Sequence, residues 1–269
     1  MSLLPVSAVI PTLNAAANLP ASLAALQGQV AEIIIADGGS TDGTVALAQA
    51  AGAQVISAAR GRGPQLRAAA AAASQPWLLA LHADMQPGPG WQAALEGFMA
   101  RPSALTTAGY FRFALDDAAP EARRLERMVA WRCRWLGLPY GDQGLLIHRD
   151  LYHALGGYQP IPLMEDVDLI RRLGRHRLKA LPVAFITSAE TPWRGKAASC
   201  CGHRGAWRLA LLPGDAGGDR LAHCAGSALA HHSCHYSRRG AGGLGTAGAA
   251  RHDAHAPGYW RFGAAHGKG

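Results

Sequence analysis

The chain has 269 residues, enough for one well-formed hydrophobic core or two small ones, and its formal net charge is +8. The charge is unevenly placed, because Lys and Arg number 16 against 15 Asp and Glu before Thr191, and 10 against 3 from there on. Clustered basic residues bind phosphates nonspecifically, but the first part is nearly neutral overall, so we expect no nucleic-acid partner.

The chain shows no sequence signal for export or membrane insertion. Its opening run lacks a basic start and is interrupted by Pro5 and Pro11. Nowhere do about 18 apolar residues follow one another, as a membrane-spanning helix requires. Only Cys133 of the five cysteines precedes the tail, so the main domain has no disulfide framework. We expect a cytoplasmic protein, with contact to the inner membrane at most peripheral.

The first eighty residues predict alternating strands and helices. Short apolar runs bounded by turn residues indicate buried strands at Val6–Ile10, Glu32–Ala36, Gln54–Ser57 and Trp77–Leu81. Between them, Ala- and Leu-rich stretches indicate helices at Asn18–Leu26, Asp42–Ala51 and Pro64–Ser74. This alternation predicts a parallel sheet with crossover helices.

The alternation loosens after Leu81, and a mixed second half is expected. The predicted helices are Trp91–Met99, Glu121–Trp135, Asp150–Leu155 and Glu165–Leu173, and the predicted strands are Leu105–Phe113, Gly144–Ile147 and Lys179–Ile186. Ligands of open α/β sheets gather at the carboxyl ends of the strands. That rule directs attention to Pro11–Asn14, Asp37–Asp42 and His82–Asp84.

Three acidic motifs could carry chemistry. The loop Asp37–Thr44 follows the second strand and is either a capped turn or a loop whose aspartate binds a base or ribose, which its position favours. Alone, His82-Ala83-Asp84 is a common hydrogen-bonded turn. In extended chain both side chains would share one side, where a carboxylate suits a hard divalent cation on a diphosphate. Glu165-Asp166-Val167-Asp168 opens a helix, where acids both stabilise the helix and can serve as a general base.

In this order, Pro11-Thr12-Leu13-Asn14, the Asp37–Thr44 loop, His82-Ala83-Asp84, Gly156-Gly157-Tyr158 and Glu165-Asp166 resemble the motifs of family 2 glycosyltransferases with the GT-A fold. The resemblance spans residues 4–189. It implies a Rossmann-like nucleotide-binding half, a mixed central sheet and an irregular tail. More narrowly, the chain resembles a bacterial branch found near radical-SAM and selenium-related genes, with His-Ala-Asp in place of Asp-X-Asp.

The resemblance implies a role for each matching position. The residues that it assigns to the nucleotide-sugar are Pro11, Thr12, Asn14, Asp37, Arg60, Arg62, Ala83 and Asp84. Asp84 would also bind a divalent cation, Mg²⁺ or Mn²⁺, Asp166 would be the catalytic base, and Glu165 would help to set up the acceptor side. The acceptor face would involve Asp142 and Gln143. For Arg60 and Arg62, simple solvation on a loop is an equal alternative.

The implied reaction is an inverting, metal-assisted single displacement, in which Asp166 takes the proton of an acceptor hydroxyl while the cation neutralises the departing diphosphate. The acceptor is unknown and either soluble or lipid-linked. Trp131 and Trp135 are expected in the core, with a sugar platform as the lesser alternative.

Departures from the family's pattern weaken only some of these roles. Ala15 replaces the usual Glu, Gly38 an Asp, Arg67 an Asn, and His82 the first acid of the metal motif. With Asp84 as the one remaining acid of that motif, the cation would be held weakly or mainly by the diphosphate.

Other activities fit less well. A sugar-nucleotide pyrophosphorylase, a GT-A-like nucleotidyltransferase, should have a Gly-rich phosphate loop directly after the first strand. A dinucleotide oxidoreductase should have its glycine fingerprint there, whereas Gly61-Arg62-Gly63 follows the third strand.

The composition changes near residue 190, which predicts a glycosyltransferase domain at 1–189 and a low-complexity basic tail at 190–269. From Thr191 onward there is no Val, Ile, Met, Glu, Asn or Gln, as expected of a GC-rich gene read in a shifted frame. We expect a disordered tail, and in that case the product could be inactive or misfolded; a genuine flexible tail is the alternative. The spacing of the tail's Cys and His residues matches no closed zinc site.

Overall fold

The computed structural model describes residues 3–187. The strands are β1 (Leu4–Thr12), β2 (Val30–Asp37), β3 (Gln54–Ser57), β4 (Trp77–Ala80), β5 (Met85–Pro87), β6 (Ala108–Leu115), β7 (Leu145–His148) and β8 (Leu178–Thr187). The helices are α1 (Leu19–Leu26), α2 (Thr44–Ala50), α3 (Arg62–Ala72), α4 (Trp91–Met99), α5 (Pro120–Leu136), α6 (Arg149–Ala154) and α7 (Glu165–Leu173). Three 3-10 turns are η1 (Ala104–Thr106), η2 (Gly141–Gln143) and η3 (Arg175–Arg177).

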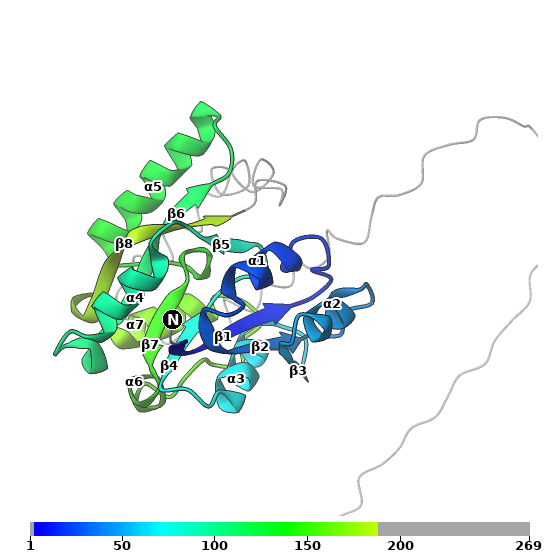
Figure 1. The fold of residues 1–269 in the computed structure, drawn as a ribbon. Coiled ribbons are helices and arrows are strands. Elements are labelled where there is room, and N and C mark those ends of the chain that lie inside the picture. The colour runs from blue at the N-terminus through cyan, green and yellow to red at the C-terminus, as the bar shows by residue number, and fades with distance from the viewer. Residues whose placement is uncertain (1–2, 188–269) are drawn as a thin grey trace, which may run out of the picture. The chain divides into compact units, whose positions relative to one another are not determined.

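All the strands belong to one mixed sheet of order β3-β2-β1-β4-β7-β6-β8-β5. The first four in this order run parallel, as the βα alternation of the sequence predicts. From β4 onward the directions change, since β7 is antiparallel to both β4 and β6, whereas β6 and β8 are parallel. The sheet therefore joins a parallel, Rossmann-like half to a mixed half along the β4–β7 pair (Figure 1).

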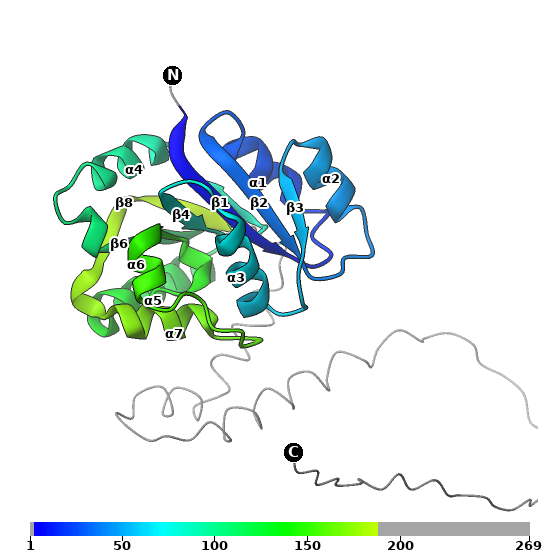
Figure 2. The same cartoon turned by 90° about the horizontal axis from the view of Figure 1, so that it is seen from below.

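A separate apolar core covers each face of the sheet. On one face, α1, α2 and α4 contribute side chains such as Leu23, Ala48 and Phe98. On the other, α3, α6 and α7 contribute side chains such as Leu66 and Leu169. Figure 2 shows these two groups of helices on opposite sides of the strands. Fully burying each large aliphatic or aromatic side chain contributes about 1.5–3 kcal/mol to the free energy of unfolding, so the two cores stabilise the sheet.

The observed mixed α/β architecture confirms the predicted fold class, and most element boundaries agree within two residues. Two predictions were wrong in detail. The strand expected from Leu105 begins only at Ala108, because Ala104–Thr106 forms a 3-10 turn. The chain at His82–Asp84 is not extended but turns, with the Met85 amide donating to the His82 carbonyl at 3.4 Å, and it then forms the unpredicted strand β5 on the edge of β8.

Among the residues that the structure describes, no helix is both long and apolar enough to cross a membrane. The expectations for residues 190–269, including the basic tail and its Cys and His residues, lie outside the described residues.

Candidate active site

The carboxyl end of β2 holds a carboxylate in a cradle of donors. Asp37 is 6% exposed, and its Oδ2 accepts from the amides of Gly39 at 2.9 Å and Ser40 at 2.8 Å. Its Oδ1 accepts from the hydroxyls of Ser40 at 2.5 Å and Thr12 at 3.1 Å. Burial alone would raise the pKa of Asp37, but the hydrogen bonds from Ser40, Gly39 and Thr12 together lower it below its usual 3.8. Asp37 is therefore a rigid anion beside Thr12 at the end of the parallel strands.

The loops after β1 and β2 are tied together by short polar contacts. Asn14, at φ 51°, accepts with Oδ1 from the Thr41 amide at 2.8 Å, and its own amide donates to Ser40 Oγ at 2.9 Å. Asp42 Oδ2 accepts from the Ala16 amide at 3.1 Å. These contacts show that the Asn14 side chain helps to build the loop. Pro11, three residues earlier near the end of β1, is partly exposed.

Gln65 on α3 fixes both strand ends, a role that the sequence reasoning missed. It is 4% exposed, and its Nε2 donates to the carbonyls of Thr12 at 2.7 Å and Ala36 at 2.8 Å. A Cβ on Gly38 would lie 3.0 Å from that Nε2, so glycine at this position leaves room for the Gln65 side chain. The only sequence signal for Gln65 was its place one turn after Gly61-Arg62-Gly63.

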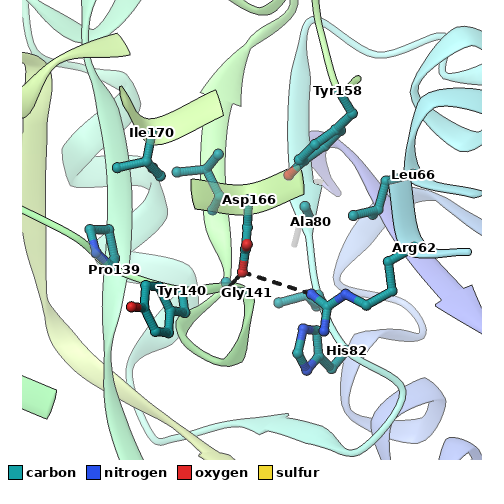
Figure 3. Close-up of a pocket in the computed structure, with 13 residues that line it drawn as sticks. Arg62, Leu66, Ala80, His82, Pro139, Tyr140, Gly141, Tyr158, Asp166 and Ile170 are labelled. Carbon is teal, nitrogen blue, oxygen red and sulfur yellow. Dashed lines mark hydrogen bonds and ion pairs between the residues drawn. The ribbon is translucent and has the colours of Figure 1, made fainter. Parts of the chain in front are cut away.

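A pocket opens beside the carboxyl end of β4, between the two halves of the sheet. Its lining is contributed by α3, the end of β4, the 139–145 segment and the start of α7, and comprises Arg62, Leu66, Ala80, Leu81, His82, Pro139, Tyr140, Gly141, Gly144, Leu145, Tyr158, Asp166 and Ile170. Of the residues predicted for the site, Arg62 and Asp166 thus meet in one pocket (Figure 3). Asp37, Asp84, Asp142 and Gln143 are not among the lining residues.

Three polar groups converge over the bare Cα of Gly141. A Cβ at this position would collide with Arg62 Nη2 and would lie 2.7 Å from His82 Nε2 and 3.1 Å from Asp166 Oδ2. Glycine therefore leaves the space in which a cation, an imidazole and a carboxylate approach each other. Figure 3 shows the Asp166 carboxylate between Gly141 on one side and Arg62 on the other, with His82 beside Arg62.

Asp166 is held from the opposite wall of the pocket. Its Oδ2 accepts from the Gly141 amide at 2.5 Å and lies 4.0 Å from Arg62 Nη2, while Oδ1 accepts from the Val167 amide at 2.7 Å. The side chain is 17% exposed. It is consequently oriented by backbone donors and still reachable from the pocket.

Glu165, its neighbour in sequence, is instead wholly buried. Its Oε1 accepts from Arg62 Nε at 2.7 Å, and Oε2 has no hydrogen-bond partner within residues 3–187. Burial raises the pKa of Glu165, an effect that Arg62 opposes and Asp166 reinforces. The close packing of Gly63 against the backbone of Ile161 brings α3 up to this segment. Glu165 therefore acts on the pocket through Arg62.

The acceptor-side prediction falls on a buried polar network. Gln143 is 2% exposed, its Nε2 donates to the Phe111 carbonyl at 3.1 Å, and its Oε1 accepts from Arg132 Nη2 at 3.1 Å and from the Tyr140 amide at 3.3 Å. Burial raises the pKa of Asp142, with Arg132 opposing the effect. Gln143 thus holds the 139–143 loop in place from its buried side, away from the pocket.

The comparisons with known proteins identify the family and the fold of the chain. The sequence profile described as Glycosyl transferase family 2 matches residues 7–158, more than half of the chain. The chain belongs to glycosyl transferase family 2. As a member of that family it is a glycosyltransferase. None of the curated protein sequences matches it.

Two solved structures share the glycosyltransferase's fold. Glucosyl-3-phosphoglycerate synthase from Mycobacterium tuberculosis, in complex with Mn²⁺, UDP and glucosyl-3-phosphoglycerate, is 23% identical with a TM-score of 0.52, over 72% of this chain and 75% of that one. S. aureus TarS 1-349 is 14% identical with a TM-score of 0.55, over 68% of this chain and 60% of that one. At these identities the likeness establishes the GT-A fold.

The residues of the glycosyltransferase offer a divalent cation few ligands. Within residues 3–187, no three acidic, His or Cys side chains cluster as a metal site. Asp84 lies partly exposed on the turn that follows β4, and the Ser22 hydroxyl anchors this turn by donating to the Ala83 carbonyl at 2.8 Å. This donor set fits a hard cation that keeps one carboxylate and takes its other ligands from phosphates and water, and it does not fit a closed protein cage.

The remaining predicted residues lie elsewhere. Arg60 is exposed outside the pocket, as is Arg67. The expectation that Trp131 and Trp135 belong to the core is wrong, since they are 56% and 60% exposed on the outer face of α5. The buried face of that helix carries small or polar-ended side chains instead, including Ala122, Val129 and Cys133.

Proposed function

We propose that this glycosyltransferase transfers a sugar from a nucleoside-diphosphate donor to a hydroxyl acceptor with inversion, and that Asp166 is the general base. The observation that carries the proposal is the convergence of Arg62, His82 and Asp166 over Gly141 in one pocket. A general base must come within hydrogen-bond reach of the hydroxyl that it deprotonates, and Asp166 is the pocket's carboxylate. Inversion follows from a single displacement on the face opposite the leaving group.

The donor half of the proposal rests on the parallel strands. Glucosyl-3-phosphoglycerate synthase from Mycobacterium tuberculosis, which shares this fold, has been crystallised with UDP and Mn²⁺ and also with UDP-glucose and phosphoglyceric acid. We assign the nucleoside to Pro11, Thr12 and Asp37, because these residues stand at the carboxyl ends of β1 and β2, where open α/β sheets bind their ligands. Asn14, Arg60 and Ala83 lie on the loops after β1, β3 and β4, and these loops would close around the nucleotide-sugar.

The diphosphate is the group that a cation and the pocket's guanidinium would neutralise. Asp84 would hold Mg²⁺ or Mn²⁺ together with the donor's phosphate oxygens, and the bound cation would supply Lewis-acid stabilisation of the leaving group. Arg62, which Glu165 fixes at its Nε, presents Nη2 to the pocket and adds a second positive charge there. Glu165 is accordingly a positioning residue.

The acceptor side is assigned to the 139–143 loop. Gln143 would contribute by fixing the Tyr140 amide at the pocket wall, and Asp142 lies in the same 3-10 turn. The acceptor's identity, soluble or lipid-linked, and membership of the branch near radical-SAM and selenium-related genes stay predictions. So does a cytoplasmic location, with membrane contact at most peripheral.

A transfer and hydrolysis screen over nucleotide-sugars, with and without Mg²⁺ or Mn²⁺, identifies the donor. With that donor, Asp166→Asn should abolish transfer and leave the dissociation constant of the nucleoside diphosphate unchanged, because only the proton acceptor is lost. Asp168→Asn is the matched control. It removes a carboxylate from the same helix turn, but this carboxylate pairs with Arg172 and lies outside the pocket. Wild-type turnover in pure Asp166→Asn enzyme would remove Asp166 from the mechanism.

We also propose that the catalytic domain spans residues 1–189 and that 190–269 is a basic segment read in a shifted frame. Val and Ile, the β-branched aliphatic residues, are absent after Thr191, and this absence supports the proposal. If it is correct, the product could be inactive, which is the second reading of the chain's function. Resequencing the gene around codon 190 tests it, and an intact frame contradicts it.

A further inference from the structure

The outer face of α5 carries an apolar stripe that lies exposed in the part of the chain that the structure describes. Met128, Trp131 and Trp135 follow one another at helical spacing of three and four residues and are 47%, 56% and 60% exposed. Figure 1 shows α5 along the outside of β6 and β8. Exposing an apolar stripe with two tryptophans to water is unfavourable in free energy, and such stripes mark interaction surfaces.

The stripe is bordered by positive charge. Arg124, Arg127 and Arg134 are exposed on the same outer half of the helix, and the Arg134 guanidinium lies 5.9 Å from the Trp135 ring centre. The exposed acid of α5 is Glu121 in its first turn, whereas Glu126 forms an ion pair with Arg123 at 2.7 Å. Along the stripe itself, the charged side chains are arginines.

We propose that α5 docks this protein onto an anionic membrane surface, with Met128, Trp131 and Trp135 entering the headgroup boundary and the arginines contacting lipid phosphates. Tryptophan prefers this boundary because its ring is apolar and its N–H is polar. An amphipathic helix with arginines beside its apolar stripe binds in the plane of the interface. This surface is separate from the pocket and requires no assumption about the reaction.

Charge complementarity selects this occupant. The segment from Thr191 onward carries 10 Lys and Arg against 3 Asp and Glu, so it has the same sign as the stripe's border. A second copy would set arginines against arginines across a symmetric contact. A surface of anionic phosphates satisfies both the arginines and the apolar side chains.

The same helix connects the surface to the pocket. On its buried side, Arg132 Nη2 donates to Gln143 Oε1 at 3.1 Å, and Arg132 Nε donates to the Leu138 carbonyl at 2.9 Å. The Arg132 guanidinium also stacks 3.6 Å from the ring centre of Tyr140, which lines the pocket. Docking through α5 would therefore leave one helix, about 10–12 Å across, between the lipid and the pocket loop. A lipid-borne acceptor that reaches past α5 to that loop is a consequence that, unlike the docking, rests on the proposed function.

The test is cosedimentation of the full chain with vesicles of phosphatidylcholine, alone or mixed with phosphatidylglycerol. We expect binding to the anionic vesicles, and about fivefold weaker partitioning for each of Arg127→Gln and Arg134→Gln. Trp131→Gln combined with Trp135→Gln should abolish binding and lower the quenching of tryptophan fluorescence by brominated lipid. The matched controls are Leu105→Gln and Arg101→Gln, exposed residues away from α5, which should bind as the wild type does.

These residues are exposed, so the variants should keep the wild-type circular dichroism and melting temperature. Undiminished vesicle binding in the α5 variants would place the interaction on other basic residues and overturn the proposal. So would a wild-type chain that ignores anionic vesicles, or one that is dimeric in solution and becomes monomeric in the tryptophan variant. None of these outcomes depends on turnover, and therefore none bears on Asp166 as the base.

Discussion

Replacing Gly141 by alanine should impair catalysis without unfolding the protein. The added Cβ would collide with Arg62 Nη2 and lie 2.7 Å from His82 Nε2, whereas ordinary contacts begin at 3.4 Å. The imidazole must then move by roughly 0.7 Å, and the guanidinium by more. Both colliding groups end flexible side chains, and Gly141 does not have a positive φ, so the backbone can accept alanine.

The size of the effect follows from the displacement. A misplacement of about 1 Å at a reacting centre costs on the order of 100-fold in rate, which corresponds to about 2.7 kcal/mol of activation free energy. By contrast, the unfolding free energy should change by less than about 1 kcal/mol, because restricting the unfolded chain offsets part of the crowding. The variant should therefore show a loss of kcat/KM that greatly exceeds its loss of stability.

The assay compares kcat/KM and urea unfolding for Gly141→Ala with the control Gly97→Ala. Gly97 lies in α4 with no atom within 4 Å of a Cβ, so alanine there should leave kcat/KM unchanged and stabilise the protein by about 0.5–1 kcal/mol. Wild-type kcat/KM in Gly141→Ala would refute the assignment of this pocket to catalysis. A collapse of stability would show instead that Gly141 serves the fold.

Three further substitutions test the donor side and the buried acids. Asp84→Asn should weaken the binding of the donor's nucleoside diphosphate and shift its divalent-cation dependence to higher concentration in calorimetric titrations, whereas unchanged titrations would exclude Asp84 as a ligand. Because the pKa of Asp37 is lowered below 3.8, its stabilising contribution is present above that pH and lost as the pH falls through the folded value; Asp37→Asn should cost stability at about pH 7 and less at about pH 3 in urea unfolding. Asp142 behaves oppositely, since its raised pKa makes the wild type lose stability as the pH rises from 3.8; the stability of Asp142→Asn relative to the wild type should therefore increase with pH, and an equal difference at about pH 4 and 7 would contradict this sign.

Most of the fold could be predicted from the pattern of apolar residues along the sequence. Strands β1, β2 and β4 of the parallel half are largely buried and contain continuous apolar runs, as at 33–36, so their positions could be predicted from the sequence alone. The three-residue strand β5 could not, because it is defined by pairing with β8, about a hundred residues later in the chain. A partner at that distance leaves no local pattern.

The place of a polar side chain in the fold was predictable where residue type and strand end coincide, as for Asp37 at the end of β2. Side-chain direction was not predictable, and this explains the misplaced residues. Trp131 and Trp135 were assigned to the core from size, yet the phase of α5 that packs on the sheet is set by Ala122, Val129 and Cys133. Gln65 carried no motif, and its two hydrogen bonds to strand-end carbonyls appear only once α3 is packed on β1 and β2.

Burial separates the acids near the pocket into different roles. Glu165 has no exposed surface and engages Arg62 through Oε1, so its carboxyl cannot reach a hydroxyl in the pocket. Asp142 has a buried Oδ1 and a raised pKa, and it does not line the pocket. A general base needs an accessible acceptor within hydrogen-bond reach of the proton that it removes. Asp166 meets that requirement because the Gly141 amide orients its carboxylate while 17% of the side chain stays exposed, and because the Arg62 that faces it is fixed in place by Glu165.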